Sequence, residues 1–266
     1  MHIHDRTFIV SGGASGLGLA TVRELHTHGG YVAILDLNAE AGMKIARELG
    51  ERTIFLEADM AKTDSITSAV NTITDWTKTT GKPIGGVIPA AGIGIGAPLV
   101  SKDNRPVSME KLDFVLNTNL RGVLDLLRQI LPHMTTNVPL EPDGERGVLV
   151  LVSSIAAFGG VPGQASYVAS KGAINSMALV LSTELAPFGI RCVAIAPGHF
   201  DTPLGQKSTA QLSDSRMRKF EATFVFPRRR GRGEEFASCV RHCIENLMLN
   251  GETIRLDGAA RIPSRL

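Results

Sequence analysis

Tyr167 and Lys171 are two residues that could move a proton. They lie four positions apart in the sequence, and Ser154 lies thirteen positions before the tyrosine. Helical residues four apart share a face, so the phenol and the ammonium would meet in one pocket. A neighbouring cation favours ionisation of a phenol, whose pKa is ~10. With Ser154 orienting a substrate oxygen, the set is typical of proton transfer beside a hydride carrier, although the pair alone is more often a solvated helix face.

A glycine-rich turn near the start of the chain supplies the expected hydride-carrier site. Residues 7–11 predict a short buried strand, Gly12, Gly16 and Gly18 follow it, and residues 19–28 predict a helix. Such a turn lets the backbone approach a pyrophosphate, and the helix N-terminus offers free N–H groups and a positive dipole end. The strand before and the helix after distinguish this motif from an ordinary tight turn.

Asp36 indicates which dinucleotide is preferred. It ends a second apolar strand at residues 31–35, about 20 residues past the turn, where a carboxylate accepts hydrogen bonds from the adenosine ribose. The same charge repels a 2′-phosphate, and neither the turn nor the residues just after Asp36 contain Arg or Lys. The sequence therefore predicts NAD rather than NADP.

Strands and helices alternate along the whole chain, which predicts an α/β, Rossmann-type doubly wound parallel sheet of about seven strands with helices on both faces. The further strands are expected at residues 52–58, 84–89, 147–153, 190–196 and 253–256. The further helices are expected at residues 39–49, 63–79, 108–134, 164–187 and 234–250. Residues 94–106 and 203–227 read as irregular, and the second stretch is expected to be a substrate lid.

Composition fits a single-domain enzyme of 266 residues, with the cofactor half at about 1–150 and the substrate half and lid at about 151–266. The net charge of +2 predicts no general attraction to nucleic acid or to anionic membranes, and no apolar run approaches ~18 residues. A strand beginning by Thr7 leaves no expected room for a leader peptide. Three cysteines without a matching ligand pair predict a reducing compartment and no metal site.

At these motifs the chain resembles the short-chain dehydrogenase/reductase family, and the resemblance runs nearly end to end. The resemblance implies an active-site tetrad of Asn119, Ser154, Tyr167 and Lys171. The cofactor contacts that the family motifs imply are Gly12, Ser15, Gly16, Leu17, Gly18, Asp36, Ala58, Asp59, Met60, Ala91, Gly92, Tyr167, Lys171, Pro197, Gly198, Phe200 and Thr202. One departure is Pro89, where the family usually has a structural asparagine, which affects local stability more than catalysis.

Within the family, the segments 163–167, 195–204 and 250–258 are most similar to the type 2 3-hydroxyacyl-CoA dehydrogenases, which also oxidise some hydroxysteroids. This implies oxidation of an L-3-hydroxyacyl-CoA thioester and a homotetramer. Substrate contacts are then expected from Ser154, Gln164, Tyr167 and Leu204. Tyr167 would exchange the proton, Lys171 would lower the tyrosine pKa, and Asn119 would hold a water. Another NAD-dependent hydroxysteroid or secondary-alcohol dehydrogenase is the alternative, and a non-catalytic NAD-binding scaffold is disfavoured by the intact tetrad.

Three further features have competing interpretations. The basic run at residues 228–232 is short and precedes Glu234 and Glu235, so a solvated loop is favoured over a landing site for coenzyme A phosphates. His199 is expected to be a packing or lid residue rather than a catalytic base. The terminal Ser264-Arg265-Leu266 resembles a peroxisomal address if the source is a eukaryote, and otherwise a cytoplasmic location is expected.

Overall fold

The computed structural model describes residues 1–96, 98–160, 162–210 and 213–261. Its core is a seven-stranded sheet with the order β3-β2-β1-β4-β5-β6-β7, in which every neighbouring pair is parallel. This confirms the predicted fold class. The strands are β1 (Thr7–Ser11), β2 (Tyr31–Asp36), β3 (Thr53–Glu57), β4 (Ile84–Pro89), β5 (Gly147–Val152), β6 (Ile190–Pro197) and β7 (Thr253–Leu256).

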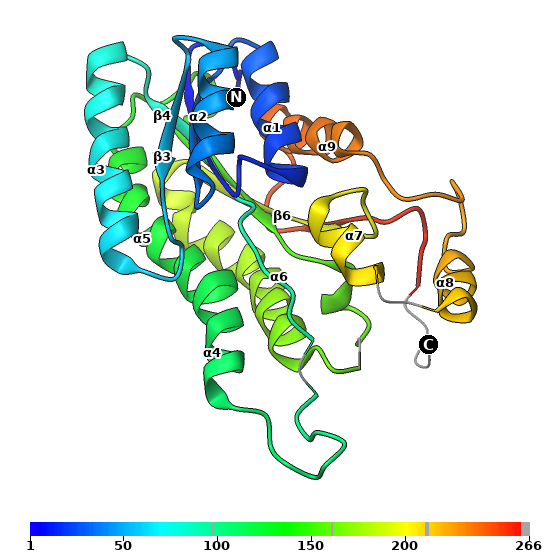
Figure 1. The fold of residues 1–266 in the computed structure, drawn as a ribbon. Coiled ribbons are helices and arrows are strands. Elements are labelled where there is room, and N and C mark those ends of the chain that lie inside the picture. Colours follow the sequence, from blue (N-terminus) through cyan, green and yellow to red (C-terminus); the bar gives the residue numbers. More distant parts are fainter. Residues whose placement is uncertain (97, 161, 211–212, 262–266) are drawn as a thin grey trace.

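Helices cover both faces of this sheet (Figure 1). One apolar core lies between the sheet and α3, α5 and α6, and a second lies between the opposite face and α1, α2 and α9. Burial on both faces explains why β1, β4, β5 and β6 are apolar without alternation. The longer helices are α1 (Gly16–Thr27), α2 (Ala39–Leu49), α3 (Thr63–Thr80), α4 (Met109–Leu116), α5 (Gly122–Thr135), α6 (Ala165–Leu185) and α9 (Gly233–Glu245).

The register brings the carboxyl ends of the central strands together. Ser11 at the end of β1 lies beside Leu35 on β2 and Pro89 on β4. The chain segments that leave these strands are the glycine turn, Asp36 and residues 90–92. In a parallel sheet, ligands bind at this edge, where the strand order reverses. The fold therefore brings the motifs predicted from separate parts of the sequence to one side of the molecule.

The helix expected over residues 108–134 is interrupted, so that prediction was wrong in its continuity. A turn of π-helix at Asn117–Arg121 separates α4 from α5. Within this turn Asn119 is fully buried and bonds to the backbone of Ile93. At the junction between the π-turn and α5, Gly122 lies against the loop that connects β3 to α3. A Cβ at this position would lie 2.0 Å from the Met60 carbonyl oxygen. A wider turn thus accommodates an inward-facing amide and a close backbone contact.

The stretch at 203–227 was expected to be irregular, but it contains two short helices, α7 (Pro203–Thr209) and α8 (Asp214–Glu221). Helix α7 has Pro203 in its first turn, and the Thr202 hydroxyl accepts a hydrogen bond from Gly205 N at 3.0 Å. A proline in the first turn after a threonine cap is a signal for the start of a helix, and the prediction from the sequence did not use it.

The last long helix ends earlier than the predicted residue 250. Helix α9 stops at Glu245, and the buried guanidinium of Arg191 donates to the carbonyl oxygens of Cys243, Ile244, Asn246 and Leu249 at 2.7–3.1 Å. These carbonyls turn toward one side chain on β6 instead of continuing the helix. The ending is therefore set by a partner more than 50 residues away in the sequence.

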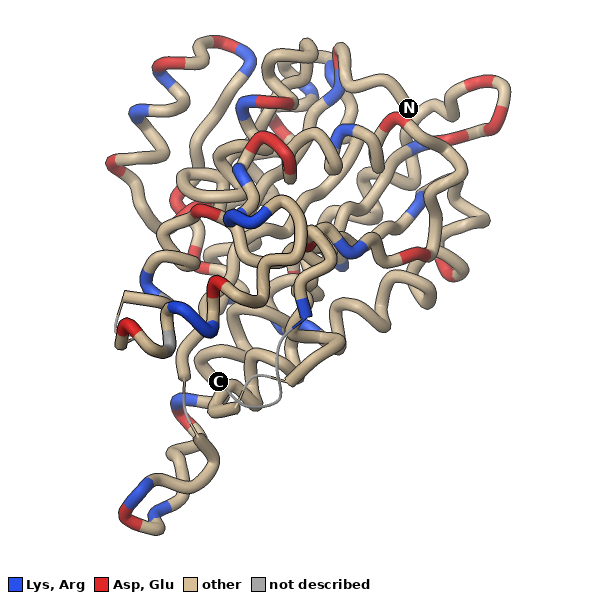
Figure 2. Tube along the Cα trace, turned by 90° about the vertical axis from the view of Figure 1, so that its right-hand side faces the viewer, with Lys and Arg blue, Asp and Glu red and all other residues tan. Residues whose placement is uncertain are grey.

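Residues 94–107 form an arm that extends below the rest of the molecule in Figures 1 and 2. Apart from residue 97 its path is irregular, as predicted, with a single antiparallel bridge between Val100 and Pro106. Charges of both signs are interspersed along the chain trace in Figure 2. None of the described helices combines the length and apolar character needed to cross a membrane.

Candidate active site

The glycine turn fits tightly between the strand ends. Gly12 has φ +67°, and a Cβ there would lie 2.8 Å from the Ala91 Cα. A Cβ on Gly18 would lie 2.1 Å from the Gly12 carbonyl oxygen. Only residues without a side chain allow this approach of α1 to the turn. The helix therefore begins against the end of β1, with its N-terminus facing the space beyond the sheet.

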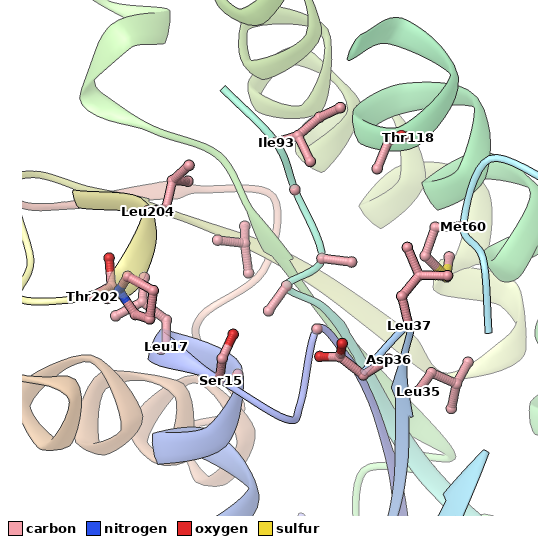
Figure 3. Close-up of a pocket in the computed structure, with 18 of the residues that line it drawn as sticks. Ser15, Leu17, Leu35, Asp36, Leu37, Met60, Ile93, Thr118, Thr202 and Leu204 are labelled. Carbon is pink, nitrogen blue, oxygen red and sulfur yellow. The ribbon is translucent and has the colours of Figure 1, made fainter. Parts of the chain in front are cut away.

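That space is a cavity of about 350 Å³ (Figure 3), within the range of small-molecule sites. The predicted residues that line it are Gly12, Ser15, Gly16, Leu17, Gly18, Asp36, Ala58, Asp59, Met60, Ala91, Gly92, Tyr167, Lys171, Pro197, Thr202 and Leu204. The residues of the lining that sequence reasoning missed are Leu35, Leu37, Ala90, Ile93, Phe114, Thr118, Val152, Ser153 and Pro203. Most of the missed residues are apolar neighbours of motif positions, and nothing in the sequence distinguishes them from core residues.

Asp36 is held at one end of the cavity by the backbone. One carboxylate oxygen accepts from Ala14 N and the other from Asn38 N, both at 3.0 Å. In Figure 3 Asp36 and Leu37 come from the end of β2, and Met60 lies on the same side. Among the described residues of the lining, Lys171 is the single basic side chain. A negative group with a fixed orientation and no nearby cation suits a ribose diol better than a phosphate.

Lys171 is buried behind the catalytic end of the cavity. Its Nζ donates to the Val152 carbonyl oxygen at 2.8 Å and lies 6.0 Å from the centre of the Tyr167 ring. Burial lowers the pKa of Lys171 to about 8, because a charged ammonium loses its hydration there. The helical spacing thus places both side chains at one site, as predicted.

The pKa of Tyr167 lies above its ordinary value. Burial raises it, and a hydrogen bond with Ser154 lowers it, but burial has the larger effect. The Lys171 ammonium donates to the Val152 carbonyl in this structure, and the expectation that it lowers the Tyr167 pKa stays a prediction. Ser154 itself is fixed, because its hydroxyl oxygen accepts from Ala156 N at 3.1 Å. The serine is therefore the group that favours the ionised phenol here.

Asn119 lies behind the same end of the cavity and joins three segments. Its amide donates to the Ile93 carbonyl at 2.8 Å and to the Ser170 hydroxyl at 3.3 Å, and its oxygen accepts from Ile93 N at 2.8 Å. A Cβ built on Gly92 would lie 3.5 Å from this oxygen and 3.6 Å from Lys171 Nζ. The two polar groups thus approach one point, which Gly92 leaves open for a small bridging group.

Five predicted residues do not line the cavity directly. Ser154 and Asn119 lie just behind it through the contacts given above, while Gln164 immediately precedes α6 and is half-buried. Gly198 N bonds to the Leu256 carbonyl at 2.9 Å, and the buried Phe200 packs edge-on against Phe236. Gly198 therefore supports the turn after β6 by a backbone hydrogen bond, and Phe200 supports it by packing on α9.

The basic run before α9 is largely engaged within the chain. Arg229 forms a two-bond ion pair with Glu235, and Arg230 bonds to the Thr209 hydroxyl and stacks over the Phe220 ring at 5.5 Å. Arg228 is exposed. Ser264, Arg265 and Leu266 lie outside the described residues. Within the described ranges, no group of three or more His, Cys, Asp or Glu side chains could hold a metal ion.

Comparison with known proteins agrees with this geometry. A family model described as short chain dehydrogenase matches residues 6–213. The chain is 39% identical over 256 residues to 3-hydroxyacyl-CoA dehydrogenase type-2 of Bos taurus, covering 96% of this chain and 94% of the relative. It is 37% identical to the Drosophila melanogaster protein of that name, covering 98% and 99%.

Two solved structures share the whole fold. That of 3-hydroxyacyl-CoA dehydrogenase type-2 from Mycobacterium avium has a TM-score of 0.87 and 35% identity, covering 98% of both chains. A 3-ketoacyl-(acyl-carrier-protein) reductase from Brucella melitensis, complexed with NADH, has a TM-score of 0.82 and 25% identity, covering 98% of this chain and 100% of that one. The family match spans the glycine turn, the strand ends and the tyrosine–lysine pair together. The chain is therefore an oxidoreductase that belongs to the short-chain dehydrogenase family and acts on a CH–OH group.

Proposed function

We propose that the protein uses NAD to oxidise a secondary hydroxyl to a ketone, and that its substrate is an L-3-hydroxyacyl-CoA thioester. The observation that carries the proposal is one cavity with Asp36 at one end and Tyr167 and Lys171 at the other. A dinucleotide needs both a ribose anchor and a reactive end, and the glycine turn between them suits its pyrophosphate.

The residues at the reactive end account for the movement of the proton. The Ser154 hydroxyl orients the substrate oxygen and stabilises the ionised form of Tyr167 through its hydrogen bond. The Tyr167 oxygen takes the proton as the alcohol becomes a ketone. Lys171 and Asn119 approach the point left open by Gly92, where a water would pass the proton on toward solvent. When bound, the nicotinamide supplies the hydride acceptor.

The preference for NAD over NADP rests on Asp36. Replacing Asp36 with Ala removes the charge that faces a 2′-phosphate, so we expect the NAD-to-NADP affinity ratio to fall on the order of tenfold. Titration of the protein with NADH and NADPH, followed by cofactor fluorescence, measures this ratio. Glu40→Ala is the matched control, because Glu40 is an exposed carboxylate on α2 that does not line the cavity. Equal affinities of the unmodified protein for both cofactors would contradict the proposal.

The choice of substrate is supported by the relatives named 3-hydroxyacyl-CoA dehydrogenase type-2. A panel of NAD-coupled assays with L-3-hydroxyacyl-CoA esters, hydroxysteroids and simple secondary alcohols tests it directly. We expect medium-length CoA esters to be turned over fastest. Turnover of steroids or alcohols with none of the esters would favour the second candidate, a hydroxysteroid or other secondary-alcohol dehydrogenase.

We propose that Arg228 assists the phosphate end of the CoA ester, since Arg229 and Arg230 are engaged with Glu235, Thr209 and Phe220. Arg228→Ala should raise KM for the ester but leave KM for an uncharged alcohol unchanged, because only binding of the charged part is lost. Equal changes for both substrates would assign the arginine a structural role.

A homotetramer is also proposed. Supporting it, Leu179 and Val180 on α6 are 65% and 62% exposed, and Phe188 just beyond the helix is 45% exposed. Large apolar side chains that are exposed at neighbouring positions of the chain are consistent with a subunit interface. Light scattering of the purified protein gives the mass, and a monomer at micromolar concentration would refute the proposal.

A further inference from the structure

The segment between Ser154 and α6 is connected to the far end of the chain by one side-chain contact. After Ser154 the chain makes a short 3₁₀ turn at Ile155–Ala157 and reaches Phe158, whose side chain is 46% exposed. The guanidinium of Arg255, on β7, lies over this ring at 4.9 Å from its centre. The stack joins two segments that are almost 100 residues apart in the sequence.

Arg255 has a fixed position before it meets Phe158. Its Nε and Nη2 both donate to one carboxylate oxygen of Asp257, at 3.0 and 2.6 Å, and Nη2 also donates to the Ala260 carbonyl at 3.3 Å. The Asp257 side chain is only 6% exposed, and its other oxygen accepts from Ala259 N. A guanidinium oriented in this way loses little further freedom when it stacks on a ring.

The segment that Phe158 begins is otherwise weakly held. In its described part, the last backbone hydrogen bond before α6 is the one from Phe158 N to the Ile155 carbonyl. A Cβ on Gly160 would meet no atom within 4 Å, and one on Gly163 would just touch Pro98 of the arm at 3.8 Å. Few backbone hydrogen bonds and open space around the two glycines allow residues 158–160 and 162–164 to adopt several conformations unless one contact selects among them.

In the sequence, this segment connects two residues of the expected reactive end, Ser154 and Tyr167. It starts four residues after Ser154 and ends at Gln164, three residues before Tyr167. We propose that Arg255 is a positioning residue that, through Phe158, selects the conformation of residues 158–160 and 162–164 in which the substrate binds beside Tyr167. The inference rests on the proposed alcohol dehydrogenase function and concerns the alcohol substrate, since none of these described residues lines the cofactor cavity.

Kinetics of Arg255→Ala test the proposal against a matched control. We expect KM for an L-3-hydroxyacyl-CoA ester to rise ~3- to 10-fold, with kcat and KM for NAD changed by less than about twofold. Arg261→Ala is the control, because Arg261 bonds to the same Asp257 carboxylate at 3.4 Å. If both variants raise KM equally, the Asp257 cluster has only a structural role and the proposal is overturned.

Phe158→Leu removes the ring from the other side and does not disturb the Asp257 cluster. It should reproduce the rise in KM, and combining it with Arg255→Ala should add nothing further, since both break one contact. Arg255→Lys retains a cation over the ring and should recover part of the loss. Additive effects of the two substitutions, or no recovery with lysine, would overturn the proposal.

Hydrogen exchange separates this inference from the function on which it rests. Amides of residues 158–160, 163 and 164 should exchange faster in Arg255→Ala than in the unmodified protein, while those of β5 and α6 remain protected. The measurement needs no substrate. Inactivity of the unmodified protein toward every alcohol would refute the proposed function alone, whereas unchanged exchange in an active Arg255→Ala variant would refute the positioning role alone.

Discussion

The cofactor end of the cavity and the segment that we expect to form a substrate lid are held in different ways. At the cofactor end, Gly12 N bonds to the Leu35 carbonyl at 2.7 Å and Ala90 N bonds to the Ser11 carbonyl at 3.1 Å, so backbone atoms of adjacent strands set the geometry. In the expected lid segment, helix α8 is strongly polar, and its buried Phe220 ring packs against His199 at 4.5 Å and Phe224 at 5.2 Å.

This difference indicates which part of the molecule tolerates change. Backbone contacts between parallel strands depend on glycines and on the register, so a single added methyl group disturbs them. The expected lid segment depends on a few side-chain contacts, so we expect substitutions there to leave the sheet intact. If the segment is a lid, such substitutions change the fit of the substrate and not the oxidation chemistry. The four predictions below test this contrast, beginning with Tyr167 at the reactive end of the cavity.

The largest effect is expected for Tyr167→Phe, which removes only the proton-transfer oxygen. Turnover should fall by ~2 to 4 decades while NADH still binds, because the glycine turn and Asp36 are untouched. Initial-rate assays and cofactor fluorescence measure the two quantities separately. Loss of both together would mean that the two ends are not independent.

Gly18→Ala should disrupt the cofactor end. Its Cβ would lie 2.1 Å from the Gly12 carbonyl oxygen, and backbone on both sides cannot give way cheaply. We expect a lower melting temperature and loss of NADH binding. Gly172→Ala on α6 is the control, because its Cβ meets no atom within 4 Å and a helical alanine gains about 0.5–1 kcal/mol over glycine. Similar melting temperatures for the two variants would contradict the tight packing of the turn.

Ser154→Ala should raise the pKa of Tyr167 further, since the hydrogen bond from Ser154 is the interaction that lowers it. The chain has two tyrosines, so tyrosinate absorbance in an alkaline titration resolves them, and the Tyr167→Phe variant identifies which step belongs to Tyr31. We expect the Tyr167 step to move to higher pH. A step that does not move would remove Ser154 as the group that stabilises the phenolate.

The smallest effect concerns His199, whose ring packs against Phe220 and Phe224. Burial first, and then the charge of Arg230, lower its pKa from the ordinary 6.5 to about 4. The unfolded chain thus binds a proton between these values and the folded chain does not, so stability is lost as the pH falls from about 6.5 to about 4. Melting temperatures at pH 7 and pH 5 should differ less for His199→Phe than for the unmodified protein. His4→Asn, at a side chain 74% exposed, is the control.

The sequence by itself determined the architecture and the chemical groups. Alternating apolar runs predicted the seven strands, because a strand buried on both faces must be apolar throughout. Gly12, Gly16, Gly18, Asp36, Tyr167 and Lys171 could be placed from spacing alone, since each lies within a turn or two of a strand end or on one helical face. These patterns involve residues that are near one another in the sequence. The parallel sheet then brings the separate patterns together at one edge, where their residues line one cavity.

The tertiary structure decided what depends on partners distant in the sequence. The π-turn that carries Asn119 exists because its amide meets Ile93 and because Gly122 meets Met60. Arg191 determines where α9 ends, and Arg255 reaches Phe158 only because β7 completes the sheet beside β6. The pKa of Tyr167 is likewise raised by burial, which outweighs the lowering effect of the hydrogen bond with Ser154. The spacing of residues in the sequence determines which side chains can meet. The tertiary packing determines how far those side chains are buried, and burial shifts their pKa values.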